Sequence, residues 1–269
     1  KKNKKVIVDS PLEFNFWRAP TDNDGIMGMD SAFYRNVEKW TNAALETVCF
    51  FANSVRAYKS RGLAIVESFG KILPMSKYLG FDANVRYIID GDGLMTVDVK
   101  GVPYGMFPPT LPRIGLHLAV NKDMRAVTWY GRGKRENYSD CIKASPVGLY
   151  RADIEDTYTV YDMPQETGNH ENTVFASFSS SNAALSIIGC DEFSFSYHDF
   201  TLDNLTKAKH RNELKKDCKN HIYIDYKMRG LGSHSCGPEP EKEFELRPHA
   251  FEFAFAIAAD IDENAALKI

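Results

Sequence analysis

Apolar and polar residues alternate with a period of two over much of the chain beyond about residue 45. This spacing puts apolar side chains on one face of an extended strand and polar side chains on the other. The clearest runs cover residues 85–89, 95–99, 114–120, 193–197, 222–226 and 251–257. Because these runs are not interleaved with helices, the pattern predicts an all-β protein built as a large antiparallel β-sandwich.

The sequence Asp90-Gly91-Asp92-Gly93 separates two of these runs, 85–89 and 95–99. Aspartate and glycine tolerate the positive φ angles that tight turns need, so the two runs are predicted to form a β-hairpin. Helical spacing is convincing only over residues 30–44 and 203–215, which we expect to form helices. No internal repeat or flexible linker interrupts the chain, and a single domain over 1–269 is expected.

Composition and charge argue against several classes of partner. The formal net charge of −3 leaves no electrostatic footprint for nucleic acid or for an anionic membrane. No apolar run approaches the ~20 residues that a membrane-spanning helix needs. The five cysteines are widely spaced and lack a Cys-x-x-Cys pair, which favours free thiols in a reducing compartment and therefore a cytoplasmic protein. The chain begins abruptly on a strand-like run at 6–8, as if it were cut from a longer protein.

The segment with the most distinctive chemistry is 16–24, which reads Phe-Trp-Arg-Ala-Pro-Thr-Asp-Asn-Asp. Pro20 fixes its own φ, and the polar residues after it favour a tight turn because their side chains bond to their own backbone. An aromatic strand end is therefore predicted to deliver Arg18, Asp22 and Asp24 into one rigid, polar corner.

Three further segments are dense in glycine and polar residues: 129–140, 163–170 and 230–238. The candidate functional residues that they present are Glu136, Asn137, Gln165, Glu166 and His170, followed by Ser233, His234, Ser235 and Cys236. The glycines lack the lysine spacing of a phosphate-binding loop, and the serines lack the Gly-x-Ser-x-Gly elbow of a hydrolase nucleophile. The seven histidines show no His-x-His or His-Glu-x-x-His spacing, so no metal site is predicted.

Taken in order, the four segments resemble the C-terminal, small-chain domain of family 2 β-galactosidases. Residues 17–24 resemble its opening motif Trp-Arg-Ala-Pro-x-Asp-Asn-Asp, and residues 129–140 its Trp-x-Gly-x-Gly-x-x-Glu-Asn-Tyr-x-Asp motif. The third segment resembles a Pro-Gln-Glu-x-Gly-x-Arg stretch, with His170 where many relatives carry arginine. The fourth is similar to a late glycine- and hydroxyl-rich loop, with Cys236 as the nearest counterpart of a tryptophan that lines the galactose pocket in some relatives.

The resemblance implies a galactose-mutarotase-like β-supersandwich with one or two short helices. In this family the two catalytic glutamates of the retaining glycosidase, and its magnesium and sodium ions, belong to a barrel domain. The implied partners are therefore that catalytic domain or large subunit and a β-galactoside substrate such as lactose, within an oligomeric enzyme. The chain itself is expected to hold no catalytic residue and no cofactor, and to complete the assembly and the rim of the active-site cleft.

Two interpretations of the polar residues stay open. In one, they form a sugar-binding pocket, with residues 233–236 on the cleft rim; the pocket candidates are Arg18, Asp22, Asp24, Glu136, Asn137, Gln165, Glu166 and His170. In the other, which we favour, Arg18 forms a buried structural ion pair with Asp22 or Glu136. Both predict that the four segments converge, with Arg18 beside a carboxylate. The loop 230–238 is expected to be exposed and mobile.

Two other functions also remain open. Stand-alone aldose epimerases share the fold that the resemblance implies, and they work with a glutamate base and a histidine acid. Glu136 or Glu166 with His170 would imitate that pair. A carbohydrate-binding module would instead need an exposed aromatic platform, for which the candidates are Trp129, Tyr130 and Tyr138.

Overall fold

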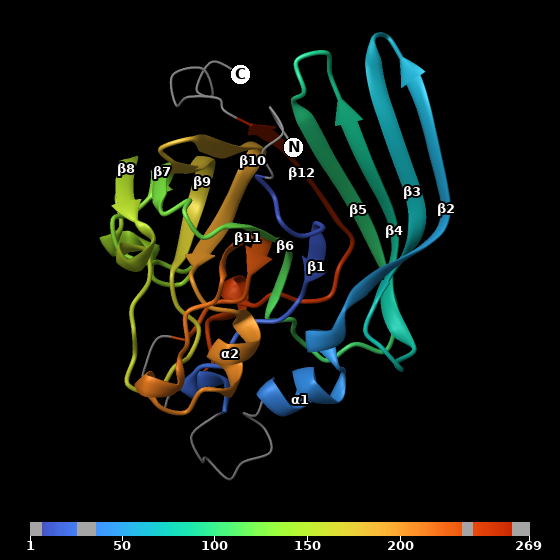
Figure 1. The fold of residues 1–269 in the computed structure, drawn as a ribbon. Coiled ribbons are helices and arrows are strands. Elements are labelled where there is room, and N and C mark those ends of the chain that lie inside the picture. The colour runs from blue at the N-terminus through green and yellow to red at the C-terminus, as the bar shows by residue number, and fades with distance from the viewer. Residues whose placement is uncertain (1–6, 26–35, 233–238, 260–269) are drawn as a thin grey trace.

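The computed structural model describes residues 7–25, 36–232 and 239–259. Within these ranges, twelve strands pair in one continuous antiparallel sheet, which confirms the predicted all-β class (Figure 1). The strands are β1 (Glu13–Asn15), β2 (Cys49–Ser60), β3 (Leu63–Leu73), β4 (Leu79–Ile89), β5 (Met95–Gly105), β6 (Arg113–Asn121), β7 (Ala126–Arg132), β8 (Val147–Asp153), β9 (Asn169–Ser180), β10 (Ala183–His198), β11 (Lys219–Met228) and β12 (Phe251–Ala259).

Strand β10 joins the two halves of the sheet. The strand order is β1-β6-β11-β10-β12-β5-β4-β3-β2, and β9, β7 and β8 branch from β10. Residues 185–189 of β10 pair with β12, whereas residues 194–198 pair with β11. The register against β9 shifts between Ile188 and Phe193, where the strand changes neighbour. Such irregularities bend a strand, and the bend allows β10 to pair with strands in both halves of the sheet. The sandwich is therefore made from a single sheet that folds over itself.

The predicted hairpin at Asp90 is confirmed and shows why these residues form it. The Asp90 carboxylate accepts hydrogen bonds from the backbone N–H groups of Asp92 and Leu94, both at 2.9 Å. Gly93 adopts a φ of 85°, which a residue with a side chain rarely does. Beyond the turn, β4 and β5 pair along their whole length, from Ile89 opposite Met95 outward. Local turn chemistry is therefore sufficient to set this register.

Two α-helices lie among the described residues, α1 (Asn36–Asn42) and α2 (Leu202–Lys207). α1 lies within the helix predicted over 30–44, of which residues 30–35 lie outside the described residues. The prediction of one helix over 203–215 is wrong. Thr201 caps the start of the helix, since its hydroxyl accepts from the Asn204 N–H, and the chain becomes extended at Ala208. The Asn204 side chain then bonds the backbone of Glu213 and Lys215, which brings the following segment back beside the helix.

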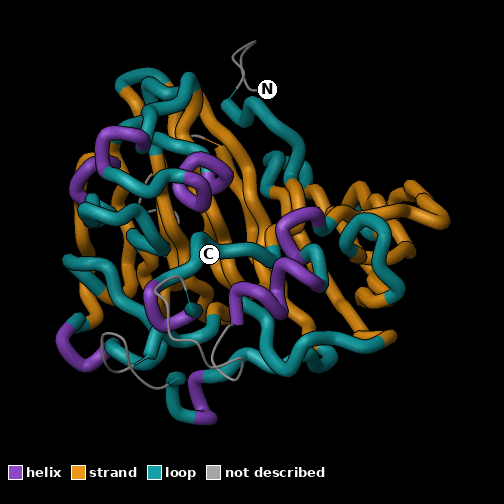
Figure 2. The backbone as a smooth tube through the Cα atoms, turned by 90° about the horizontal axis from the view of Figure 1, so that it is seen from below, coloured by secondary structure: helices purple, strands orange, loops and turns teal. Residues whose placement is uncertain are grey.

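The remaining helical elements are single 3₁₀ turns: η1 (Asp22–Asp24), η2 (Leu45–Thr47), η3 (Ile142–Ala144), η4 (Ile154–Asp156), η5 (Arg211–Glu213) and η6 (Lys242–Phe244). Seen from below, helices and loops lie across one end of the molecule, with the strands behind them (Figure 2). The four sequence motifs are carried by the segments after β1, between β7 and β8, before β9 and after β11. Among the described residues, no helix is long and apolar enough to cross a membrane.

Candidate functional site

The four motif segments meet around a buried ion pair between Arg18 and Asp24. Both side chains are fully buried, and the Arg18 Nη2 atom lies 2.8 Å from the Asp24 Oδ1 atom. The Arg18 Nε atom donates to the other carboxylate oxygen at 3.3 Å. The guanidinium also donates to the backbone carbonyl of Arg229, in the segment after β11. The prediction that Arg18 pairs with a nearby aspartate is confirmed.

The partner of Arg18 is Asp24, not Asp22 or Glu136 as the favoured interpretation proposed. The reason is the 3₁₀ turn η1, which folds Asp24 back over Thr21 so that its carboxylate accepts from the Thr21 N–H at 3.0 Å and from the Thr21 hydroxyl at 3.1 Å. Asp22 stays partly exposed at the start of the turn. A carboxylate that caps its own turn is held in place by local hydrogen bonds as well as by the arginine.

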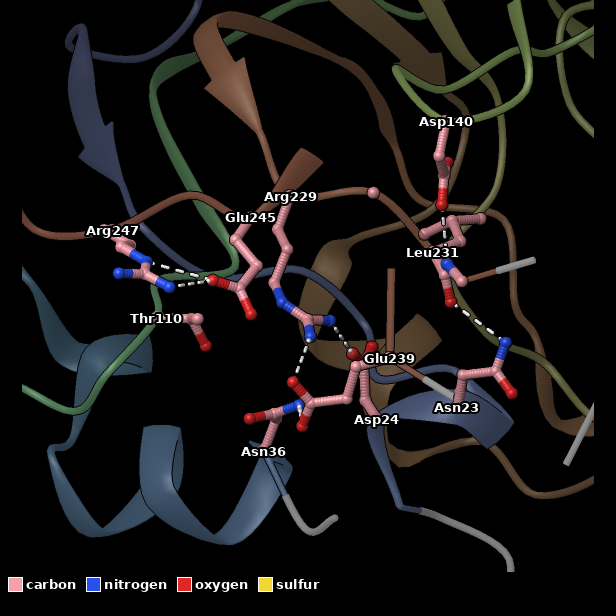
Figure 3. A network of polar contacts seen from close by, with 12 residues as sticks. Asn23, Asp24, Asn36, Thr110, Asp140, Arg229, Leu231, Glu239, Glu245 and Arg247 are labelled. Carbon is pink, nitrogen blue, oxygen red and sulfur yellow. Dashed lines mark hydrogen bonds and ion pairs between the residues drawn. The ribbon is translucent and has the colours of Figure 1, made fainter. Parts of the chain in front are cut away.

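A second buried arginine, Arg229, shares the Asp24 carboxylate. Its Nη1 atom lies 3.4 Å from Asp24 Oδ1, and its Nη2 atom lies 3.2 Å from a Glu239 carboxylate oxygen (Figure 3). Burial, and then the neighbouring Arg18 charge, lower the pKa of Arg229. Both guanidinium groups lie over the ring of Trp40, at 5.4 and 5.9 Å from its centroid. An aromatic face stabilises cations in this geometry, so Trp40 belongs to the site.

The segment after β11 is tied to two of the other motifs. The Asn23 amide donates to the Leu231 carbonyl at 3.0 Å, and the Asp140 carboxylate accepts from the Gly232 N–H at 2.7 Å (Figure 3). Gly230 is buried, and a Cβ atom there would lie 2.7 Å from the Asp140 carboxyl carbon. The expectation of an exposed 230–238 loop is therefore wrong at Gly230. Ser233, His234, Ser235 and Cys236 lie outside the described residues.

Glu136 joins the second motif to the third. Its carboxylate accepts from the Tyr161 hydroxyl at 2.5 Å, from the Thr167 hydroxyl at 2.7 Å and from the Gly168 N–H at 2.5 Å. The next residue, Asn137, donates its backbone N–H to the Asn169 carbonyl at 2.7 Å. Hydrogen bonds thus link all four motifs, and their predicted convergence is confirmed. Glu136 acts here as an acceptor that holds two loops together.

Glu166 is buried in the same region but, unlike Glu136, accepts no hydrogen bond from the described residues. Its side chain is only 2% exposed, and neither carboxyl oxygen has a hydrogen-bond partner among the described residues. Burial raises the pKa of Glu166 to about 7, against the opposing effect of the Arg113 and Arg18 charges. The Tyr138 hydroxyl is also buried and lacks a partner in the described part of the chain. These polar atoms lie below the surface and do not form an open sugar pocket.

Glu166→Gln is expected to stabilise the fold in a pH-dependent way. The folded-state pKa of about 7 lies above the ordinary glutamate pKa of 4.5. The stability that the protonated carboxyl provides is therefore complete below pH 4.5 and is lost as the pH rises through 7. Such a difference corresponds to about 3 kcal/mol. Urea unfolding should show the variant gaining about this much over the wild type between pH 4.5 and about 8. The exposed Glu252→Gln change is the control, and a pH-independent difference for Glu166→Gln would contradict the assignment.

His170 does not form an acid–base pair with a glutamate. It is fully buried, with its ring stacked on Phe195 at 5.0 Å between centroids and tilted against Trp129 at 4.7 Å. Its Nε2 atom lies 3.2 Å from the Thr157 carbonyl, and burial lowers the pKa of His170 to about 4. The ring is therefore neutral at physiological pH and packs in the core. His170 therefore does not form, with Glu136 or Glu166, the acid–base pair that the epimerase alternative requires.

The proposed aromatic platform is not formed either. Trp129 is fully buried and donates its indole N–H to the Arg132 carbonyl at 2.9 Å, and Tyr138 is 3% exposed. Only Tyr130 is well exposed, at 40%. Alternation along β7 places Trp129 and Tyr130 on opposite faces of the sheet, so they do not present one surface.

Of the sugar-pocket candidates in the described part of the chain, only Asp22, Glu136 and Gln165 are partly exposed. They are the ones that an outside ligand can reach, whereas the buried members hold the loops in place. Among the described residues, no group of three or more histidines, cysteines or acids is arranged to hold a metal ion. Sequence reasoning missed Trp40, Arg229 and Glu239, which lie outside the recognised motifs. The only signal for Trp40 was its place in a predicted helix.

Comparison with solved structures finds weak overall similarity to aldose epimerases. A galactose 1-epimerase from Lactobacillus acidophilus NCFM matches with a TM-score of 0.42 and 9% sequence identity, over 77% of this chain and 66% of that one. An aldose epimerase homologue from C. elegans matches with a TM-score of 0.41 and 12% identity, over 77% of this chain and 69% of that one.

Sequence comparison gives a more specific result. A β-galactosidase from Actinobacillus pleuropneumoniae is 31% identical over 257 residues, which cover 95% of this chain and 24% of that protein. A β-galactosidase from Kluyveromyces lactis is 29% identical over 90% of this chain and 23% of its own length. The chain thus spans about a quarter of the length of these curated relatives. The family model described as "Beta galactosidase small chain" matches residues 1–257, and the chain belongs to this family.

Proposed function

We propose that this chain is the non-catalytic small-chain part of a β-galactosidase that hydrolyses terminal β-galactosides such as lactose. The observation that carries the proposal is the family match over residues 1–257, combined with relatives that are about four times longer. The remaining three quarters of such an enzyme would belong to a larger catalytic domain or subunit. We assign to that partner the catalytic carboxylates and the magnesium and sodium ions, within an oligomeric, cytoplasmic enzyme.

The site geometry supports a positioning role for this chain. A retaining glycosidase needs two carboxylates about 5 to 5.5 Å apart, both able to reach the sugar. Here Glu166 is buried, and Glu136 already accepts three hydrogen bonds from the loop before β9. The buried ion pair of Arg18 and Asp24 instead fixes the loops of one end of the molecule. We propose that this fixed surface, with Asp22, Glu136 and Gln165 partly exposed, forms part of the rim of the partner's active-site cleft.

A chimeric enzyme tests the proposal. The quarter of the Actinobacillus pleuropneumoniae enzyme that matches this chain is replaced by the chain, and hydrolysis of nitrophenyl-β-galactoside is measured. We expect the truncated enzyme and the isolated chain to be inactive and the chimera to be active. The host must lack its own galactosidase. Turnover by the isolated chain, or full activity of the truncated enzyme, would contradict the proposal.

A further inference from the structure

A hollow lies away from the four motif loops. It has a volume of about 610 Å³ and is lined by residues of β1, the start of β2, β4, β6, α2 and β11. In Figure 1, β1 lies between β6 and the strands β2 to β5. None of the motif residues in the described part of the chain lines it. What it binds is therefore a question separate from the function proposed above.

One wall of the hollow is aromatic. Phe14 and Phe50 contact each other with ring centroids 5.9 Å apart, and Tyr87 lines the same hollow from β4. On another wall, His117 is stacked on Tyr223 at 4.8 Å and on His221 at 5.2 Å. Flat apolar faces of this kind pack against the C–H groups of a ligand.

A chain of hydrogen bonds fixes the protonation of the two histidines. The Asp217 carboxylate lies 3.0 Å from the Nε2 atom of His221. Because a carboxylate only accepts, the His221 Nε2 atom carries the hydrogen and donates this hydrogen bond. The His221 Nδ1 atom then accepts, at 3.0 Å, from the Nε2–H group of His117. Burial lowers the pKa of His117 to about 3, so its ring is neutral. Its Nδ1 atom is therefore a hydrogen-bond acceptor.

This acceptor faces a second acceptor. The His117 Nδ1 atom lies 3.7 Å from a carboxylate oxygen of Glu13, and neither atom carries a hydrogen to share. Each of the two atoms can accept from a donor supplied by a ligand. The Nδ2 amide group of Asn15, which also lines the hollow, is a buried donor with no partner among the described residues. The hollow thus offers acceptors at His117 and Glu13 and a donor at Asn15, and the hydroxyl groups of one polyhydroxylated ligand can both donate and accept.

From this geometry we propose that the hollow binds a neutral, polyhydroxylated ligand of monosaccharide size, with hydroxyl groups that donate to His117 and Glu13 and its apolar face on the aromatic wall. No lysine or arginine is among the described residues that line the hollow, whereas Glu13, Glu46 and Asp203 are. That charge disfavours phosphorylated or carboxylated sugars. An alkylammonium ion would suit the carboxylates and the rings, but it has no acceptor to offer Asn15.

Titration of the 269-residue chain with D-galactose, followed through the imidazole ¹⁵N resonances, tests the proposal. We expect galactose to shift the His117 Nδ1 resonance, because a new hydroxyl donates to that atom. Galactose 6-phosphate should shift it far less. If tetramethylammonium shifts it and galactose does not, the hollow is a cation site and the proposal is wrong.

Glu13→Gln is the decisive variant, because its new amide group can donate to His117 Nδ1 and occupy the acceptor from within the protein. The Glu13 side chain is 58% exposed, so the fold should tolerate the change. We expect galactose to bind about fivefold or more weakly, which is the effect of losing one hydrogen bond. His117→Phe, which removes the acceptor but keeps a ring, should act in the same direction. Glu252→Gln, at a side chain that is 62% exposed on β12, is the matched control. Equal galactose binding by the wild type and Glu13→Gln would overturn the proposal.

Discussion

Asp24→Asn is expected to lower the free energy of unfolding by about 3–5 kcal/mol, the usual cost of removing one partner from a buried ion pair. The aspartate is the carboxylate between two arginines, Arg18 and Arg229, and all three side chains are fully buried. An asparagine of the same shape leaves those two cations facing each other without a negative charge between them. It also loses the charged cap on the Thr21 N–H.

Urea unfolding followed by circular dichroism measures this effect. The control is Asp82→Asn, which breaks an exposed ion pair with Lys71 whose two side chains are 62% and 40% exposed. Exposed pairs of this kind contribute little, so the control midpoint should barely move. If both variants lost the same small amount of stability, the buried pair would not be organising the site.

Local turn chemistry and alternation made much of the fold predictable from the sequence. The hairpin at Asp90 depends on residues within a few positions of each other, and the strand runs at 114–120 and 193–197 appear within β6 and β10. The helix predicted over 203–215 failed because Asn204 bonds the backbone of Lys215 and turns the chain back. Helical periodicity describes only neighbours along the chain, so it cannot reveal such a contact.

The candidate site was predictable in its members but less so in their roles. The motifs identified Arg18 and Asp24, yet their burial depends on Arg229, which is 211 residues from Arg18 in the sequence. His170 reads as a polar candidate, but neighbouring strands place its ring between Trp129 and Phe195. Sequence spacing indicates which residues are unusual. Whether they face solvent or the core is decided by strands that are distant along the chain.

Burial also distinguishes residues that stabilise the loops of the site from residues that a ligand or partner could contact. Arg18, Asp24 and Glu166 are each no more than 2% exposed, so their charges act on the protein itself. Glu136 is partly exposed, but its hydrogen bonds to Thr167 and Gly168 are already made. A rim surface that must meet a partner benefits from loops fixed in advance, because less conformational freedom is lost on association.

Trp40→Ala is expected to be as destabilising as the loss of Asp24, at about 3–5 kcal/mol. The side chain is fully buried, and its indole N–H donates to the Thr110 carbonyl at 2.9 Å. Removing the ring leaves a large cavity and an unpaired carbonyl. It also takes away the aromatic face under the Arg18 and Arg229 guanidinium groups. Tyr78→Ala, at a ring that is 90% exposed, is the control and should change the urea midpoint little.

Two further measurements distinguish the ring's packing from its electrostatic contact with the arginines. Trp40→Phe keeps an aromatic face and loses the bond to Thr110, so it should cost about 1–3 kcal/mol, less than Trp40→Ala. Combining Trp40→Ala with Asp24→Asn should give a coupling energy of at least about 1 kcal/mol, because both changes act on the same two guanidinium groups. Additive losses would mean that Trp40 stabilises the fold through packing alone, and the assignment of Trp40 to the site would then be wrong.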